Sequence, residues 1–144
     1  MPTGEIKDPY VNFNFLVEIG GITRAAFQEV SGLNATIDVI EHREGGENTT
    51  PRKLPGKTKY GNITLKWGMV DDTDLYQWHL DTVKGKIERK NGSIILLDRG
   101  GNELTRWNFE RGWLSKYEIG QLSAEGNDVT TVTIEIVHEG LTQA

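Results

Sequence analysis

The sequence feature that most limits the possible folds of this chain is an alternation of apolar and polar residues in two neighbouring segments. Residues 35–42 read ATIDVIEH and residues 61–67 read GNITLKW, so apolar side chains recur at every second position at Ala35, Ile37 and Val39 and at Ile63, Leu65 and Trp67. Successive side chains of a β-strand point to opposite faces of the sheet, and a period of two therefore indicates a strand with one buried face. The two segments predict two amphipathic strands.

Residues 43–60, between these strands, predict a long charged loop. Gly45–Gly46, Pro51 and Pro55–Gly56 interrupt the segment, and such residues break regular structure. A compact domain rarely keeps so long a loop unless the loop moves or binds something. Its acidic residues precede its basic residues, namely Glu44 and Glu47 before Arg52, Lys53, Lys57 and Lys59. Two interpretations stay open: a loop that complements a second copy head to tail, or an ordinary solvated loop.

The remaining sequence predicts further short strands and one helix. Alternation indicates strands over residues 13–19, 22–30, 93–98, 103–113 and 130–138, with tight turns at Gly20–Gly21 and Gly100–Gly101 and a bend near Gly112. Residues 73–84 predict a helix, with an apolar stripe formed by Tyr76, Leu80, Val83 and Ile87. Residues 114–128 show no regular pattern. We therefore expect a mainly β fold with one α-helix, in which packed antiparallel sheets form a sandwich or a barrel.

Length and composition narrow the function classes. A chain of 144 residues predicts one domain, here residues 11–144, preceded by a flexible N-terminal arm over residues 1–10. Cysteine is absent, which excludes disulfides, thiolate zinc sites and cysteine nucleophiles. The net charge of −5 argues against a nucleic-acid-binding domain. No secretion signal or membrane-spanning run is visible, so we expect synthesis and assembly in the cytoplasm.

Candidate catalytic groups are few and scattered. The three histidines lie far apart in the sequence, and no metal, nucleophile or phosphate-binding motif accompanies them. Asp71, Asp72 and Asp74 could hold a cation, although capping of the following helix explains them better. The glutamates near the loop, Glu41, Glu44 and Glu47, lack an arranged partner and are interpreted as solvated charge. The sequence therefore predicts no enzyme.

Four tryptophans are many for a chain of this length. Large aromatic side chains occur mostly in cores and interfaces. A carbohydrate-binding sandwich could use them as a sugar platform, which keeps a non-catalytic binding module as an alternative. Trp67 and Trp107, however, continue apolar faces of predicted strands, so we expect both in the core.

Four short motifs, in a fixed order, resemble one protein family. They are FQEVSGL at residues 27–33, EHREG at 41–45, KLPG at 53–56 and NITLKWG at 62–68. In this order and spacing they resemble the tail tube proteins of contractile phage tails, and even more the inner tube proteins of phage-derived contractile injection systems. The resemblance extends over roughly residues 10–140.

The resemblance implies a structural role. Proteins of this family form hexameric rings, in which the sheets of neighbouring copies join into one continuous barrel around a channel. The rings stack into a tube inside a contractile sheath, and contraction drives the tube through a target envelope. The implied partners are further copies of the chain, a sheath protein, baseplate, tube initiator and terminator proteins, and a protein or DNA cargo. A related initiator or terminator with the same fold remains an alternative. No catalytic residue and no cofactor is implied.

The resemblance also assigns two sets of residues. The loop is expected to contact adjacent subunits or rings through Arg43, Glu44, Gly45, Gly46, Glu47, Arg52, Lys53, Leu54, Pro55 and Gly56. The polar faces of the two amphipathic strands are candidates for the channel lining, namely Thr36, Asp38, Asn62, Thr64 and Lys66.

Overall fold

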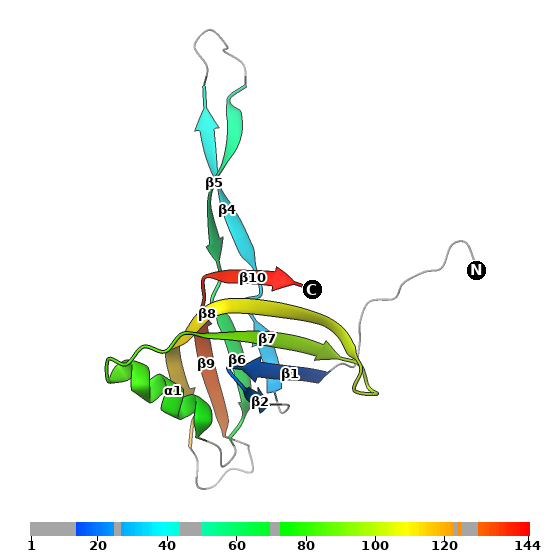
Figure 1. The fold of residues 1–144 in the computed structure, drawn as a ribbon, viewed down its shortest axis with the longest axis vertical. Coiled ribbons are helices and arrows are strands. Elements are labelled where there is room, and N and C mark those ends of the chain that lie inside the picture. Colours follow the sequence, from blue (N-terminus) through cyan, green and yellow to red (C-terminus); the bar gives the residue numbers. More distant parts are fainter. Residues whose placement is uncertain (1–13, 25–26, 44–49, 70–72, 123, 125–129) are drawn as a thin grey trace, which may run out of the picture.

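The computed structural model describes residues 14–24, 27–43, 50–69, 73–122, 124 and 130–144. The expected N-terminal arm, residues 1–10, lies outside the described residues. The rest confirms a mainly β, antiparallel fold with one helix (Figure 1). The elements are β1 (Asn14–Ile19), β2 (Ile22–Arg24), β3 (Phe27–Ser31), β4 (Ala35–His42), β5 (Arg52–Tyr60), β6 (Ile63–Gly68), α1 (Asp74–Val83), β7 (Lys90–Leu97), β8 (Glu103–Ile119), β9 (Thr131–Val137) and β10 (Gly140–Gln143).

Most strands belong to one sheet that bends back on itself. The strand order is β2-β1-β7-β8-β9-β6-β3, with β10 beside β8. The first part of β8 pairs with β7 and β10, whereas the part from Trp113 onward pairs with β9. The change of partner falls beside Arg111, whose φ of 55° is in the left-handed region. The bend expected near Gly112 is thus present, and it folds the sheet into two layers.

The core lies between these two layers. Alternate residues of β6 and β9 are buried, as the sequence pattern predicted, and Ile63, Leu65 and Ile134 are fully enclosed. Burying one such side chain contributes roughly 1.5–3 kcal/mol relative to leaving it exposed. Trp67 is buried, which confirms its core assignment, whereas Trp107 is half-buried and packs against the core. The described strands do not close into a barrel, because β2 and β3 remain the two ends of the strand order.

Helix α1 covers the core beside the second part of β8, but with a different face from the predicted one. Leu75 and Trp78 are its buried residues, whereas Tyr76 and Val83 are exposed. The indole N–H of Trp78 donates to the carbonyl of Glu88 at 2.7 Å, which satisfies its polar atom. The helix ends at Val83, before Gly85 at φ 91°, so the outer half of the predicted stripe has no core to cover.

The described N-terminus of α1 tests the expected capping at two residues, Thr73 and Asp74. Thr73 occupies the N-cap position without a side-chain hydrogen bond, and Asp74 is the acidic residue of the first turn. Asp71 and Asp72 lie outside the described residues.

No helix in the described part of the chain has the length and apolar character needed to cross a bilayer.

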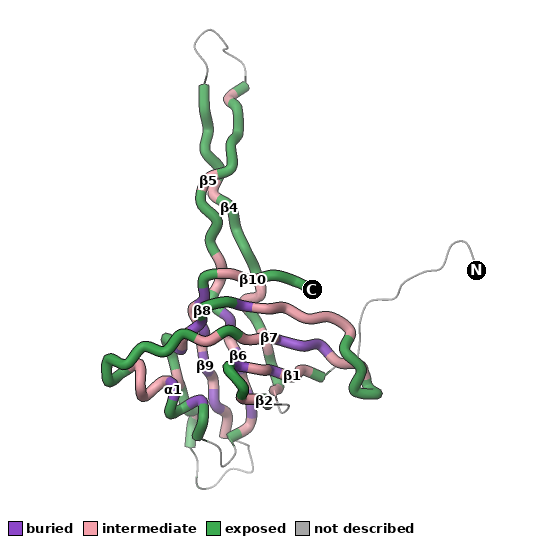
Figure 2. Tube along the Cα trace, in the orientation of Figure 1, coloured by how far each residue is buried: buried purple, intermediate pink, exposed green. Residues whose placement is uncertain are grey.

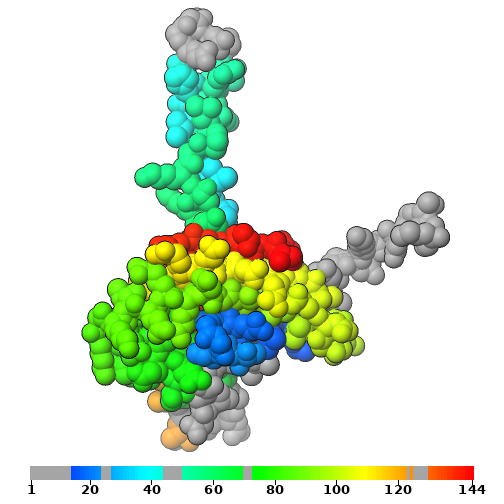
Figure 3. Space-filling model, in the orientation of Figure 1, coloured from blue at the N-terminus to red at the C-terminus, as the bar shows by residue number. Residues whose placement is uncertain are grey.

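Strands β4 and β5 form a separate antiparallel hairpin that stands away from the two layers (Figures 1 and 3). The predicted irregular loop over residues 43–60 is therefore wrong for residues 52–60, which form β5. Pro55 is tolerated because the hairpin has free outer edges, and because the register shifts by one residue between Ile37 and Val39. A proline at such a bulge removes no essential ladder hydrogen bond.

Three further boundaries differ from the sequence prediction. The segment predicted as one strand over residues 22–30 is split into β2 and β3, which lie at opposite ends of the strand order. Strand β8 continues to Ile119 instead of ending at Trp113. Residues 140–143, for which no strand was predicted, add β10 to the edge of β8.

Candidate functional site

The β4–β5 hairpin has two faces set by its register. Cross-strand partners share a face, so Ile37 lies with Thr58, and Val39 with Pro55. The opposite face carries Ile40 with Leu54, and Asp38, whose carboxylate lies 3.3 Å from the ammonium of Lys59. We call these the odd face and the even face of the hairpin, after the residue numbers of β4.

The hairpin is exposed along most of its length (Figure 2), so the buried face predicted for residues 35–42 is wrong for the single subunit. The exposed fractions are 53% for Ile37 and 65% for Val39 on the odd face, and 52% for Ile40 and 44% for Leu54 on the even face. A two-stranded hairpin is marginally stable in water, and apolar area left exposed contributes nothing to its stability. The arrangement fits a segment that another surface covers on both sides.

The structure locates part of the predicted contact set on this hairpin. Arg43 directly follows β4, whereas Glu44, Gly45, Gly46 and Glu47 lie outside the described residues. The remaining members, Arg52, Lys53, Leu54, Pro55 and Gly56, all belong to β5. Across the hairpin, Lys53 lies opposite Glu41 and Arg52 opposite His42. The basic side of the segment therefore belongs to a strand with defined side-chain directions.

The predicted channel-lining residues lie in two different sheets. Thr36 and Asp38 belong to the even face of the hairpin, whereas Thr64 and Lys66 belong to β6 and Asn62 directly precedes it. The structure therefore does not bring the five residues together on one wall.

Asn62, Thr64 and Lys66 share a surface with residues that sequence reasoning did not select. Glu29 of β3 lies opposite Lys66, Glu135 of β9 opposite Thr64, and Lys116 of β8 opposite Glu135. We call this surface the polar face of the sheet, and its residues are Glu29, Ser31, Asn62, Thr64, Lys66, Lys116, Glu118, Thr133 and Glu135.

Several side chains of the polar face bind one another. The side-chain amide of Asn62 donates to the carboxylate of Glu135, and Lys116 forms an ion pair with Glu118 at 2.9 Å. The hydrogen bond to Glu118 and its negative charge raise the pKa of Lys116 above the usual lysine value. The alternation in residues 130–138 pointed to Glu135. The bulge at Ser115 obscured the alternation of Lys116 and Glu118.

The four strands that carry the polar face have an open edge on each side. Among the described strands, β3 pairs only with β6, and the part of β8 after Trp113 pairs only with β9. An open edge presents backbone donors and acceptors that another strand can pair with. The layer therefore offers two pairing edges, one polar face and one face buried against the core.

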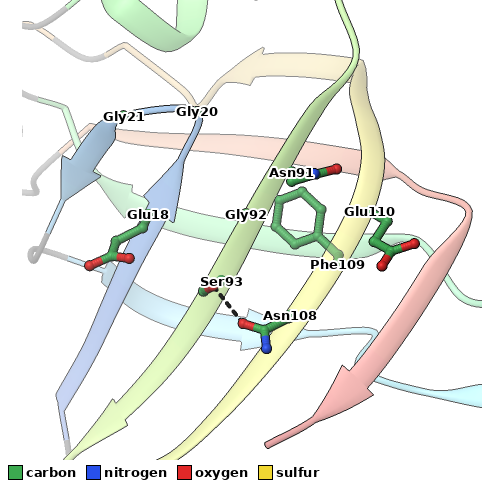
Figure 4. Close-up of a pocket in the computed structure, with 9 residues that line it drawn as sticks. All are labelled: Glu18, Gly20, Gly21, Asn91, Gly92, Ser93, Asn108, Phe109 and Glu110. Atoms are coloured by element: carbon green, nitrogen blue, oxygen red, sulfur yellow. Dashed lines mark hydrogen bonds between the residues drawn. The ribbon is translucent and has the colours of Figure 1, made fainter.

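A separate open cavity of about 380 Å³ lies on the outer side of β1, β7 and β8 (Figure 4). Ser93 donates to the side-chain oxygen of Asn108 at 2.6 Å within it, and Glu18 and Glu110 lie on either side. Within the described ranges, no group of three or more His, Asp or Glu side chains is arranged to hold a metal ion.

Known proteins that resemble this chain identify its family. The family model for the T4-like virus tail tube protein gp19 matches residues 11–142. The chain therefore belongs to this family of structural tail tube proteins. A comparison with curated protein sequences finds no match.

Solved structures of contractile injection systems contain similar chains. A chain in the sheath–tube complex of the extracellular contractile injection system PVC, in the extended state, is 27% identical with a TM-score of 0.84, over 96% of this chain and 93% of that chain. A chain in the PVC sheath/tube terminator structure is 26% identical with a TM-score of 0.84, over 97% and 99%. A chain in the baseplate of the anti-feeding prophage is 26% identical with a TM-score of 0.80, over 96% and 97%.

Proposed function

We propose that this chain is the repeating subunit of the inner tube of a contractile injection system or phage tail. We also propose that residues 11–144 form a single tube domain, of which the family model matches residues 11–142. The observation that carries the proposal is the layer β3-β6-β9-β8, with its two open edges, its polar face and its buried face. Pairing β3 of one copy with the end of β8 in the next would continue this layer around a ring. Six copies, as the family resemblance implies, would close it.

In such a ring the polar face lines the channel. The opposite face of the layer is committed to the core, so only the polar face is free to meet water and cargo. Asn62, Thr64 and Lys66 are then lumen residues, whereas Thr36 and Asp38 serve the hairpin instead. Glu29, Glu118 and Glu135 alternate with Lys66 and Lys116 on this wall, so neither sign of charge dominates a region of it.

The hairpin supplies contacts between copies. Its exposed apolar residues lie on both faces, and a surface of a neighbouring subunit or ring would bury them. The proposed contact residues are Arg43, Glu44, Gly45, Gly46, Glu47, Arg52, Lys53, Leu54, Pro55 and Gly56. Burying apolar area gives each contact its strength, and the charged residues give it register.

A tube subunit of this kind has several classes of partner. They are further copies of this chain, a sheath protein around the tube, baseplate, initiator and terminator proteins at its ends, and a protein or DNA cargo inside. The subunit acts mechanically and without catalysis or a cofactor, and it assembles in the cytoplasm into a tail-like particle.

Negative-stain electron microscopy of the purified chain, with and without baseplate proteins, tests the proposal. We expect hollow tubes of stacked rings from the wild-type chain. Reversing two charges of β5 (Arg52→Glu with Lys53→Glu) is expected to stop tube growth while the monomer stays folded. The matched control reverses two exposed charges beside the helix (Lys86→Glu with Arg89→Glu) and should leave growth unchanged. Tubes of normal length from the β5 variant would contradict the hairpin contacts, and no tubes under any condition would contradict the tube itself.

A terminator role is the second candidate, because one matched chain comes from a sheath/tube terminator structure. The two roles differ in copy number. A tube subunit occurs along the whole tube, whereas a terminator occurs at one end. Immunogold labelling along isolated tubes separates them.

A further inference from the structure

We propose that His138 is a proton-dependent pin, a side chain that ties the base of the β4–β5 hairpin to the start of β10. It does so only when both ring nitrogens carry a proton. The ring lies where three segments meet: the end of β9, the start of β10 and the junction between β5 and β6. The inference concerns the single subunit, and only its consequence for tubes rests on the proposed function.

The ring of His138 faces two backbone carbonyl oxygens. Its Nδ1 lies 3.1 Å from the oxygen of Gly140, and its Nε2 lies 3.0 Å from the oxygen of Gly61. A carbonyl oxygen only accepts, so each contact is a hydrogen bond only if the nitrogen carries a proton. A neutral imidazole has one N–H and the charged form has two. Only the charged ring can therefore make both hydrogen bonds at once.

The position is enclosed, which raises the cost of an unmade hydrogen bond. His138 is 8% exposed, and its ring lies 5.5 Å from the ring of Tyr60 and 6.1 Å from that of Phe109. Water has little access to replace a lost partner, so removing one ring proton leaves a nitrogen lone pair against a carbonyl oxygen. The expected response is a movement of one carbonyl away from the ring.

Gly61 is the point at which such a movement reaches the hairpin. It directly follows β5, and its N–H donates to the carbonyl of Asn34, which directly precedes β4, at 3.3 Å. Both strands of the hairpin therefore leave the body at one hydrogen-bonded pair, and His138 binds that pair from the body side. A change at Gly61 displaces both strands together.

The two ring nitrogens of His138 face backbone carbonyl oxygens, and several charged side chains of the neighbouring elements are engaged elsewhere. Arg111 and Glu139 pair with each other, and Glu135 accepts a hydrogen bond from Asn62. In the described part of β10 no side chain titrates. The titratable and charged side chains on the elements around His138 include Arg52, Lys53, Lys57, Lys59 and Tyr60 on β5, Lys66 on β6, Glu103, Arg106, Glu110, Arg111, Lys116 and Glu118 on β8, Glu135 on β9, and Glu139 beside β10.

Nuclear magnetic resonance of the ¹⁵N- and ¹³C-labelled chain tests the inference, in solution for dispersed subunits or by magic-angle spinning for assembled tubes. The pH is varied from about 5 to about 9, a range that brackets ordinary histidine titration. We expect both ring nitrogens of His138 to show protonated signals at the low end. The carbonyl ¹³C signals of Gly61 and Gly140 should then shift with the same midpoint as the loss of one ring proton.

Two variants separate the pin from a general pH effect. His138→Gln should abolish the shared midpoint at Gly61 and Gly140, whereas His42→Gln, on the exposed part of the hairpin, should retain it. Carbonyl signals that stay constant while His138 titrates would overturn the inference, as would a ring that carries one proton throughout. If the variant does not fold, the wild-type titration alone decides.

The consequence for assembly is measured separately. If the subunit forms tubes, the growth rate of wild-type tubes should change across the midpoint of His138, and the change should be absent from His138→Gln. A subunit that shows the shared midpoint but never forms tubes would contradict the proposed function and leave the pin intact.

Discussion

The ring of Phe109 occupies the space in which a side chain on Gly92 would stand. A Cβ built on Gly92 would lie 2.4 Å from Cζ of Phe109 and 2.7 Å from the carbonyl oxygen of Glu18. Phe109 is 1% exposed, so its ring cannot turn outward without leaving the core. The glycine near the start of β7 is therefore required by the packing of β8 against β1 and β7.

Replacing Gly92 with alanine is expected to destabilise the subunit by about 1–3 kcal/mol, because the added methyl group overpacks a filled site. The matched control is Gly140→Ala, where the nearest atom would lie at an ordinary 3.6 Å. Urea unfolding followed by fluorescence measures both. Equal unfolding free energies for the two variants would contradict the packing argument.

Stability and assembly should respond to different apolar residues. Ile37→Ser with Val39→Ser changes two exposed side chains on the odd face of the hairpin, so we expect a change in unfolding free energy within about 0.5 kcal/mol and a loss of tube growth. Ile134→Ala changes a residue that is 0% exposed and should cost about 2–5 kcal/mol. Urea unfolding and electron microscopy are made on both variants. Normal tubes from the serine variant would show that the odd face is not a contact.

Asp98 should contribute to stability in a pH-dependent way. The backbone N–H of Asn102 donates to its carboxylate at 2.9 Å and lowers the pKa of Asp98 below its usual value of 3.8. A carboxylate with a lowered folded pKa stabilises the fold above the unfolded pKa, and this contribution disappears as the pH falls through the folded pKa.

The difference in unfolding free energy between wild type and Asp98→Ala should therefore be present at neutral pH and vanish in acid, below the unfolded value of 3.8. Thermal unfolding over a pH series measures it. Glu88→Ala, which removes an exposed carboxylate outside the β7–β8 turn, controls for the change in net charge. A difference that grows in acid would contradict the assigned hydrogen bond.

The sequence predicted the elements whose pattern depends on one buried face. The alternation in β6 and β9 is complete because both strands lie in the middle of a layer with the core on one side. Strand β5 was missed because Pro55 and Gly56 break regular structure in most contexts, and only the bulge and the free edges of the hairpin accommodate them. The helix face was missed because Trp78 and Leu75 turn toward the core, whereas the longer apolar stripe passes the end of the helix.

The candidate site was partly accessible from the sequence. The motifs pointed to β6 and to the segment that contains the hairpin, and the structure places the channel candidates Thr36 and Thr64 in different sheets. Strand partners decide which polar residues share a face, and the sequence alone does not specify them. Glu29 and Lys116 join the polar face only through pairing with β6 and β9.

The bend of β8 has a mechanical consequence. This single strand of 17 residues crosses from one layer to the other, so covalent backbone as well as side-chain packing connects the proposed channel wall to the outer layer. When a tube is pushed along its axis, shear between the channel wall and the outer layer would pull on β8 along its backbone, where covalent bonds resist it. In such a subunit the continuous backbone of β8 carries force from one layer to the other, so force transfer does not depend on the packing between the layers alone.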